Sequence, residues 1–481
     1  MGVLSELQPR EVFHYFEEIC GIPHGSSNTK AISDYLVKFA GEHGLAYRQD
    51  SHNNVIIRKP GTKGYENAAS VILQGHIDMV CEKEEGCDID FEKDGLRLRL
   101  EDGVVTAEGT TLGGDDGIAV AYSLAILASD TIPHPPLEAV FTVDEEIGML
   151  GAAALDCSDL SSRIMLNMDS EDEGHLLVSC AGGISVVGRL PVKREECQGT
   201  VLQLTVTGLQ GGHSGVEIDK GRGNACQLLG RALYRLAQTC SYRLIDVNGG
   251  LKDNAIPRQA TARLLLGDSN QEWEEPVRQL SEVCAAEYRL TDPEVRIAIT
   301  HQGEQAQQVM TEEATGKVIA ALVNLPGGIQ RMSFDIEGLV QTSLNLGILK
   351  TQEQEVTLSF AVRSNVGTEK EALVERIKCL MEALGGTVKS SGDYPAWEYR
   401  QDSALRDLMI QIFEEQYGRK PTVEAIHAGV ECGLFVGKMP GLDCVSFGPD
   451  MKDIHTPKES MSVDSVQRTW EYILEILKRL G

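Results

Sequence analysis

The chain has 481 residues, of which 72 are acidic and 44 are basic, so 44 − 72 gives a formal net charge of −28. At ~150 residues per domain, this length accommodates roughly three domain-sized units. The hydrophobic fraction of 42% is enough for large cores, and the acidic balance argues against a nucleic-acid or anionic-membrane partner, since phosphate binding requires clustered Lys and Arg.

The N-terminal segment lacks the basic and apolar regions of a signal peptide, and no apolar run reaches the ~18–20 residues that cross a bilayer. The twelve Cys are scattered without a C-x-x-C spacing, which is typical of reduced thiols in a cytosolic chain. We therefore expect a cytoplasmic protein that has no contact with membranes.

The first part of the chain, to about residue 180, alternates between strand-like and helix-like segments. Apolar positions recur at helical spacing in 30–43, and 118–128 is a second, apolar helix. Short apolar runs predict strands at Val55–Ile57, Val71–Leu73, Ala139–Val143 and Ile164–Met168. This alternation is typical of an α/β domain with a mostly parallel sheet that helices cover on both faces.

The pattern changes between residues 184 and 399, where alternating strands dominate. We expect strands at 201–208, 260–266, 295–300 and 354–364, and helices at 222–237, 277–287 and 370–384. These predict an inserted α+β domain at 184–399 that is long enough for two units. The first pattern then returns, with a helix at 404–416, a strand at Cys444–Phe447 and a helix at 463–480. Residues 1–183 and 400–481 therefore form one discontinuous α/β domain.

Groups of His, Asp and Glu follow the predicted strands or begin a predicted helix. His76 and Asp78 follow Val71–Leu73, and residues two apart on an extended segment face the same way. A carboxylate beside an imidazole is the usual support of a metal-bound His. The other groups are Asp115-Asp116 before the helix at 118–128, Glu145-Glu146 after Ala139–Val143, Asp169 after Ile164–Met168, and His455 after Cys444–Phe447.

Each group has an ordinary interpretation when it is taken alone, as a polar pair or as a helix cap. Together they lie past strand ends, where open α/β sheets bind ligands. Two His and several carboxylates without Cys suit Zn²⁺, Mn²⁺ or Co²⁺, and they suffice for two ions that share a carboxylate, as in aminopeptidase-type hydrolysis. Of Glu145 and Glu146, one could then bind metal while the other moves the proton of a water.

The motifs GHIDMV, GTTLGGDDG, DEEIG, NMDSEDEG and IHTPKES resemble those of the co-catalytic zinc metallopeptidases, the family that includes peptidase T, carboxypeptidase G and the carnosinases. GLQGGHSG, DNAIPRQA, AVRSN and HAGVECG are similar to motifs of the family's dipeptidases, so the resemblance covers essentially the whole chain. It implies hydrolysis of unblocked dipeptides, including Xaa-His. The alternatives are an N-acyl-amino-acid deacylase or carboxypeptidase of the same fold, or a non-catalytic relative that binds metal or peptide.

The resemblance also implies the roles of individual residues. Asp115 would bridge two zinc ions, with Mn²⁺ or Co²⁺ as substitutes, held by the full set His76, Asp115, Glu146, Asp169 and His455. Asp78 would orient His76, and Glu145 would be the general base that passes the proton of water to the leaving amine. The family has a cis peptide bond at the position of Asp115-Asp116, and Asp116 departs from the Asn of many relatives.

For the inserted domain, the resemblance implies a lid over a small peptide substrate. His213 would stabilise the oxyanion, Asn254 and Arg363 would contact the substrate, and Gly429 and Glu431 would shape its pocket. Arg suits bidentate binding of a terminal carboxylate. A tight turn around His213 and a surface role for Arg363 stay as the ordinary alternatives. In simpler relatives the lid His acts in the active site of the partner subunit. Two alternatives therefore stay open: a homodimer through this domain, or a second α+β unit of the same chain that replaces the partner.

Overall fold

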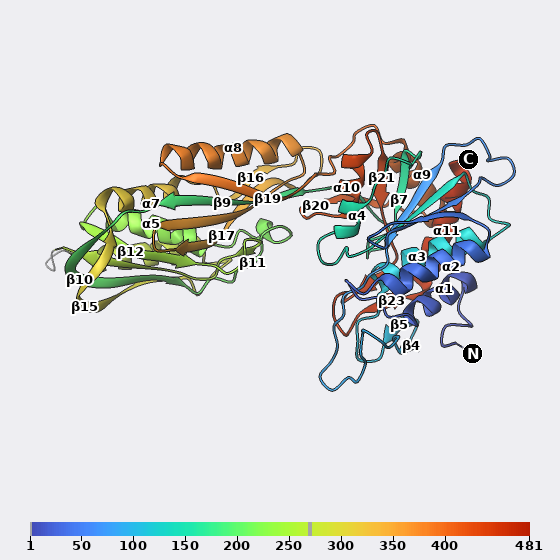
Figure 1. Ribbon diagram of the computed structural model, residues 1–481, viewed down its shortest axis with the longest axis horizontal. Helices are drawn as coiled ribbons and strands as arrows, with labels where there is room; N and C mark the ends of the chain where they lie inside the picture. The colour runs from blue at the N-terminus through green and yellow to red at the C-terminus, as the bar shows by residue number, and fades with distance from the viewer. Residues whose placement is uncertain (1, 268–271) are drawn as a thin grey trace. The chain divides into compact units, whose positions relative to one another are not determined.

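The structure is a computed structural model that describes residues 2–267 and 272–481, and these form two compact units (Figure 1). Unit 1 comprises Met1–Cys180, Tyr399–Ala425 and Val430–Gly481. Unit 2 comprises Ala181–Glu398 together with Ile426–Gly429. The chain thus returns briefly to unit 2 at Ile426–Gly429, which no sequence pattern indicated.

An eight-stranded sheet forms the centre of unit 1. Its order is β1 (Ala46–Gln49), β2 (Val55–Lys59), β6 (Leu137–Thr142), β3 (Val71–His76), β7 (Ile164–Asn167), β21 (Asp443–Ser446), β8 (His175–Cys180) and β20 (Thr422–Ile426). The central strands β6, β3, β7 and β21 are parallel, whereas β1 and β2 on one side and β8 on the other are antiparallel to their neighbours. This confirms the predicted α/β class with a mostly parallel sheet.

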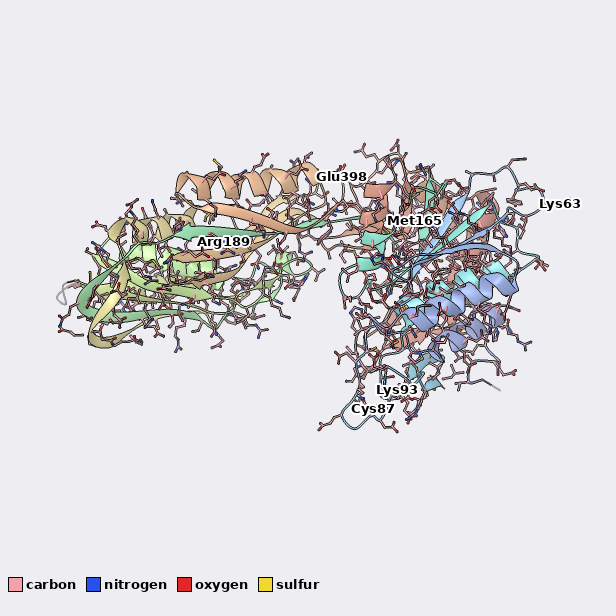
Figure 2. All side chains as sticks on the ribbon, in the orientation of Figure 1. Lys63, Cys87, Lys93, Met165, Arg189 and Glu398 are labelled. Carbon is pink, nitrogen blue, oxygen red and sulfur yellow. The ribbon has the colours of Figure 1, made fainter. Side chains whose placement is uncertain are left out.

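Helices cover this sheet because its central strands are apolar on both faces. Every residue of β3 and β6 is buried, and Met165 on β7 lies inside the unit, while Lys63 and Lys93 are exposed on its loops (Figure 2). The main helix contacts are α3 on β3, α2 on β1 and β2, and α9 and α10 on β21. The helices are α1 (Arg10–Cys20), α2 (Lys30–Glu42), α3 (Gly114–Ala128), α4 (Leu150–Ala154), α9 (Ala404–Tyr417), α10 (Glu431–Lys438) and α11 (Val463–Arg479).

A small four-stranded sheet in unit 1 joins two segments that are far apart in the sequence. Its order is β22 (Met451–Lys452), β23 (Ser460–Ser462), β5 (Val104–Ala107) and β4 (Leu98–Glu101). The antiparallel pairing of β23 with β5 fixes the loop between β22 and β23 beside the segment that leads into α3. That loop carries His455.

Unit 2 is built on a nine-stranded sheet in which all the described pairs are antiparallel. Its order is β15 (Arg296–Met310), β10 (Arg194–Thr207), β14 (Ala260–Leu266), β12 (Tyr242–Gly249), β17 (Val340–Thr351), β18 (Glu355–Ser364), β9 (Gly182–Pro191) and β19 (Thr387–Tyr394), with β16 (Gly328–Met332) paired to β17. The strands pack with α5 (Ala225–Leu236), α6 (Glu274–Glu287), α7 (Glu312–Asn324) and α8 (Gly367–Ala383) around one apolar core. A short ribbon of β11 (Gly212–His213) and β13 (Ala255–Ile256) completes the unit.

All twelve Cys are free thiols, and no helix in the described part of the chain is long and apolar enough to cross a bilayer.

Candidate active site

Three neighbouring parallel strands bring the predicted metal ligands of unit 1 to one edge of the sheet. His76 is the last residue of β3, Glu145 and Glu146 come shortly after β6, and Asp169 comes two residues after β7. Because β6, β3 and β7 are adjacent and parallel, their carboxyl ends meet, and this is the edge where open α/β sheets bind ligands.

Asp115 lies between two imidazoles at the beginning of α3. Its Oδ1 is 3.1 Å from Nε2 of His76, and its Oδ2 is 3.2 Å from Nε2 of His455. The peptide bond from Asp115 to Asp116 is cis, as the resemblance implied, and both residues have backbone angles outside the helical range. One carboxylate therefore faces both His residues of the cluster.

His455 approaches the cluster from the loop between β22 and β23. Its Nε2 is 3.0 Å from Oε1 of Glu146 as well as 3.2 Å from Asp115, while its own side chain is 46% exposed. These two carboxylates raise the pKa of His455 to about 10. His455, Glu146 and Asp115 thus form one side of the cluster, open to solvent through the imidazole.

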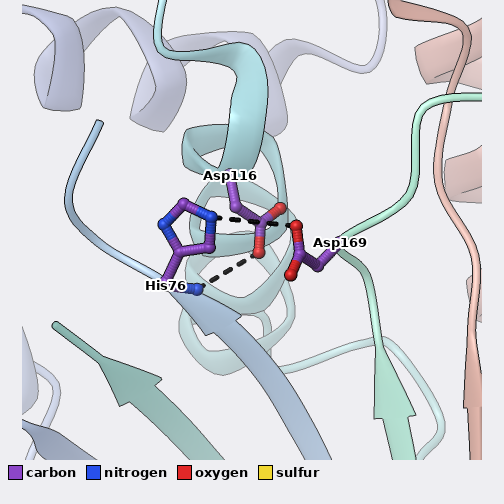
Figure 3. A group of neighbouring side chains, drawn as sticks. All are labelled: His76, Asp116 and Asp169. Atoms are coloured by element: carbon purple, nitrogen blue, oxygen red, sulfur yellow. Dashed lines mark hydrogen bonds and ion pairs between the residues drawn. The ribbon is translucent and has the colours of Figure 1, made fainter. Parts of the chain in front are cut away.

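The other side of the cluster is buried and includes Asp116, which sequence reasoning had not counted as a ligand (Figure 3). Oδ1 of Asp169 is 3.7 Å from Nε2 of His76, and Oδ2 of Asp116 accepts the backbone N–H of His76 at 3.2 Å. Oδ1 of Asp116 is buried without a hydrogen-bond partner. An unpaired buried carboxylate oxygen is costly, so it indicates a partner that this part of the site is built to receive.

The donor set fits divalent cations. Ligand atoms of His76, Asp116 and Asp169 lie within 4.8 Å of one another, and so do those of His76, Asp115 and Glu146. Among the described residues, no Lys or Arg forms an ion pair with these carboxylates. Burial, followed by the negative charge of Asp116, raises the pKa of Asp169 well above its ordinary value, and the charge of His76 opposes this shift only in part. Cations with oxygen and imidazole ligands would supply the missing charge.

Asp78 connects His76 to the two glutamates. Its backbone carbonyl is 2.9 Å from Nδ1 of His76, and its carboxylate accepts the backbone N–H of Glu145 at 3.0 Å and the hydroxyl of Ser26 at 2.8 Å. Burial alone would raise the pKa of Asp78, but the hydrogen bond and charge of His76 lower it. Asp78 is therefore placed to orient both the imidazole and the segment that carries Glu145.

A buried polar network lies beneath the predicted ligands, and it contains Glu431, which sequence reasoning had assigned to the substrate pocket instead. Oε2 of Glu431, at the beginning of α10, accepts hydrogen bonds at 2.6 Å from Nε2 of Gln74 and from the hydroxyl of Thr142, and Oε1 of Gln74 accepts Nδ2 of Asn167 at 2.5 Å. Gln74, Thr142 and Asn167 belong to β3, β6 and β7. The network thus joins the three ligand-bearing strands, and Glu431 supports the metal side of the site.

The residues predicted to bind substrate gather in unit 2. A Cβ on Gly215 would lie 2.9 Å from Cε1 of His213, 3.2 Å from Nε of Arg363 and 2.7 Å from the carbonyl of His427, so these groups surround one point. Nη1 of Arg363 donates to the hydroxyl of Tyr394 at 3.0 Å, and its Nε is buried without a partner. Arg363 is therefore held on one side and has donor capacity left.

His213 is held in one tautomer by its own loop. Its Nδ1 accepts the backbone N–H groups of Gly215 and Val216, both at 3.2 Å, so the proton of the neutral ring is on Nε2. Burial, followed by the charge of Arg363, lowers the pKa of His213 and keeps the ring neutral. His213 can therefore donate one hydrogen bond from Nε2.

Two other predicted residues have weaker positions in this cluster. The backbone carbonyl of Asn254 accepts the N–H of Ser214 at 2.9 Å, but the Asn254 side chain is exposed. Gly429 is half-buried in the short segment that returns to unit 2. His427 in that segment was part of a recognised motif but was not singled out, although it bonds Ser343 at 2.7 Å and Asn365 at 3.2 Å.

Comparisons with known proteins identify the family of the chain. The sequence pattern described as Peptidase family M20/M25/M40 matches residues 72–479. Cytosol non-specific dipeptidase of Escherichia coli K12 is 36% identical over 484 residues, which cover 100% of this chain and 99% of the relative. The crystal structure of aminoacylhistidine dipeptidase from Vibrio alginolyticus is similar with a TM-score of 0.91 at 39% identity, over 99% of this chain and 98% of that chain. Aminopeptidase PepT from Bacillus cereus shares the fold, with a TM-score of 0.57 at 16% identity over 98% and 99% of the two chains. The chain therefore belongs to Peptidase family M20/M25/M40 and is a hydrolase that acts on peptide bonds.

Proposed function

We propose that the protein hydrolyses unblocked dipeptides, including Xaa-His, at a site that holds two zinc ions. The observation that carries this proposal is Asp115, whose two carboxylate oxygens face His76 and His455 separately. The dipeptide substrate rests on similarity along the full chain to proteins named cytosol non-specific dipeptidase and aminoacylhistidine dipeptidase. The first of these names also supports a cytoplasmic location.

The ligand roles follow from the two sides of the cluster. His76 and Asp169 would hold one ion, His455 and Glu146 the other, and Asp115 would bridge them. Two such ions, with Mn²⁺ or Co²⁺ as substitutes for zinc, supply Lewis acidity to the carbonyl of the peptide bond and make water more acidic. Asp78 keeps His76 oriented through the contacts described above.

Glu145 is the proposed general base. It lies next to the ligand Glu146, and its backbone is held by Asp78. Burial raises the pKa of Glu145 to about 8, with the carboxylates of Glu431 and Glu146 adding to the shift. A carboxylate with a raised pKa accepts a proton from water readily and can return it to the leaving amine.

Unit 2 is the proposed lid, corresponding to the inserted domain expected at 184–399. His213 would donate from Nε2 to the oxyanion, in keeping with the tautomer fixed by its loop. Arg363 would bind the terminal carboxylate of the dipeptide, and Asn254 and Gly429 would line the substrate site. Arg363 supports this role because its buried Nε has no hydrogen-bond partner among the described residues.

The test of substrate class compares an Xaa-His dipeptide with its N-acetylated form, while bound metal is counted before and after chelation. We expect cleavage of the free dipeptide only, lost on chelation and restored by Zn²⁺ or Mn²⁺. Cleavage of only the acetylated form would make the protein a deacylase of the same fold. Cleavage of neither, with two ions bound, would show that the substrate class is wrong.

The test of the base is Glu145→Gln. We expect metal content close to that of the wild type and a fall in kcat of at least ~10²-fold, because the amide cannot accept the proton of water. Asp144→Asn, next to it in the same loop, is the matched control and should keep most of the turnover. Unchanged turnover in Glu145→Gln would remove Glu145 from the mechanism.

Unit 2 is also the proposed surface for a homodimer. Leu251 and Phe334 on this unit are 93% and 89% exposed, so both apolar side chains are available for contact with a second copy of the chain. Sedimentation equilibrium should show a dimer that Leu251→Ser combined with Phe334→Ser weakens. A wild-type protein that stays monomeric at all concentrations would contradict the dimer without affecting the proposed chemistry.

A further inference from the structure

Glu459 is a buried carboxylate that the roles assigned above do not include. It is only 3% exposed and lies in the loop between β22 and β23, four residues after His455. Its Oε2 accepts the backbone N–H of Leu112 at 2.8 Å and of Gly113 at 3.2 Å, and its Oε1 accepts that of Gly114 at 2.8 Å. Both oxygens are thus occupied by main-chain donors, and Glu459 makes no ion pair with a Lys or Arg of the described chain.

These three donors immediately precede Asp115, and the N–H of Asp115 itself is a fourth donor, 3.5 Å from Oε1 of Glu459. The first N–H groups of a helix have no partner within the helix and carry partial positive charge, so a carboxylate is a favourable acceptor there. Gly114 is the first residue of α3, Gly113 is its N-cap and Leu112 precedes the cap, so Glu459 receives the N–H groups of the segment that leads into the helix. Gly114 allows the close approach, since a Cβ on it would lie 3.3 Å from Oε1 of Glu459 and 3.0 Å from Sδ of Met451.

Glu459 is also firmly connected to His455. The N–H of Glu459 donates to the carbonyl of Thr456 at 3.0 Å, which closes a tight turn directly after His455. The next residue, Ser460, begins β23, which is paired with β5. A short chain of fixed contacts therefore leads from His455 through Glu459 to the backbone of Asp115, whose Oδ2 is 3.2 Å from Nε2 of His455.

We propose that Glu459 is a positioning residue that sets the separation of Asp115 and His455, and thereby the affinity for the metal ion that these two side chains share. The inference rests on the proposed metal centre, but it concerns a residue that touches no metal and no substrate. Supporting groups of this kind commonly change metal affinity by 10–100-fold when they are altered. Asp115 would also contribute to the ion on the side of His76 and Asp169, but those two ligands are positioned by β3 and by the segment after β7, so that ion should be affected less.

The test is Glu459→Gln, which retains one carbonyl oxygen but replaces the other acceptor with an N–H₂ group facing backbone donors. Chelator competition would give the dissociation constants of both zinc ions. We expect the constant of the ion held by His455 and Glu146 to rise about 10-fold or more, and that of the ion held by His76 and Asp169 to change by less than about 3-fold. Unfolding of the metal-free variant would be measured in parallel.

Glu138→Gln is the matched control. Glu138 is also a buried carboxylate, 5% exposed, that accepts backbone N–H groups from Ser161 and Ser162, but it is near the beginning of β6, at the opposite end from the ligands. Its replacement should lower the stability of unit 1 without changing either metal constant. If Glu138→Gln and Glu459→Gln weaken metal binding equally, the effect is one of general stability and the proposal is wrong.

A second variant, Glu459→Asp, covers the case in which the amide prevents folding. It keeps the charge but is one methylene too short to reach all three donors, so selective loss of one ion is again expected. If this variant folds and the dissociation constants of both zinc ions are unchanged, Glu459 only caps the helix and the proposal is wrong. Failure of the proposed function alone would look different, since the wild type would then bind two ions without cleaving peptides. A wild type that binds no metal ion would contradict both the proposed function and the role of Glu459.

Discussion

The absence of a side chain at Gly75 allows Asp116 to lie beside His76 in the proposed metal site. A Cβ at this position would lie 2.5 Å from Oδ2 of Asp116 and 2.6 Å from Cβ of Ala119, so no larger residue fits between β3 and α3. Gly75→Ala should push Asp116 and the neighbouring His76 apart and weaken metal binding by at least about 10-fold, on the scale of supporting contacts. Chelator competition on the purified variant would measure this.

Gly41→Ala is the control for this substitution. A Cβ on Gly41, in α2, meets nothing within 4 Å, and Ala is the better helix former. This variant should bind metal like the wild type and be slightly more stable. Equal metal affinity in Gly75→Ala and Gly41→Ala would show that Asp116 and His76 tolerate displacement.

The grouping of the proposed ligands could be predicted because chemistry and position coincide in the sequence. His76 and Asp169 each stand at or just past an apolar run, and the structure places them together. Asp116 was predicted in the acidic group but not as a ligand, and His427 was not singled out. Asp116 reaches β3 because the backbone at the start of α3 is not helical. His427 reaches unit 2 because the chain returns there for four residues. Neither feature produces a periodic pattern of apolar residues that could be read from the sequence.

His427 leads to a pH-dependent prediction for its segment. It is buried against Ser343 and Asn365, with Arg363 and His213 nearby, and burial followed by these two groups lowers its pKa from 6.5 to about 3. Between these values the unfolded chain binds more protons than the native one, so the free energy of unfolding falls as the pH falls from 6.5 towards 3. The contribution is up to about 1.4 kcal/mol for each pH unit.

The check is the pH dependence of urea unfolding for the wild type and for His427→Gln. Gln retains hydrogen-bonding groups but does not titrate, so the variant should lose less stability on acidification than the wild type. Parallel curves for the two proteins would contradict a neutral buried His427.

The strands of unit 1 depend on the polar network beneath the ligands. Gln74→Met keeps the approximate size of the side chain but leaves Nδ2 of Asn167 without its acceptor and removes one donor to Glu431. We expect the free energy of unfolding of the metal-free protein to fall by about 1–3 kcal/mol, the cost of unsatisfied buried groups.

Leu73→Met is the control for the network, because Leu73 is the buried apolar neighbour on β3. A volume-conserving apolar exchange costs less than ~1.5 kcal/mol. Chemical denaturation would measure the free energy of unfolding of both variants. An equal decrease in Gln74→Met and Leu73→Met would show that the hydrogen bonds of the network add no stability beyond ordinary packing.

At the level of elements, the sequence predicted the fold class and the resemblance identified the family, and both are confirmed. Helices and strands with strong periodicity matched closely, as in β14 at 260–266 and α9 at 404–417. The antiparallel flanks β1 and β8 could not be predicted, because an apolar run does not carry the direction of its partner. The long strand β17 was missed because most of its residues are buried, so that it lacks alternation.

For the whole molecule, the division into two units predicts that metal stabilises only unit 1. An ion at 100 times its dissociation constant contributes about 2.7 kcal/mol to the state that binds it. Chelation should therefore lower the unfolding midpoint of unit 1 and leave that of unit 2 unchanged.

The Trp residues allow each unit to be followed separately. Trp470 stacks on Tyr122 in unit 1, with ring centroids 6.1 Å apart, whereas Trp273 packs against the core of unit 2. Variants that retain only Trp470 or only Trp273, with the third Trp, Trp397 of unit 2, also replaced, would report each transition by fluorescence. Equal shifts of both transitions on chelation would show that the two units unfold together.

The position of β21 between β7 and β8 has a consequence for how the protein is made. The ribosome adds 262 residues (443 − 180 − 1) between β8 and β21, which takes roughly 15–50 s, and during that time unit 2 can fold while β7 presents an unpaired apolar edge. Nascent chains therefore need shielding at this edge. Because His455, a proposed metal ligand, is translated later still, an unfinished chain lacks part of the proposed centre, and we expect it not to cleave peptides.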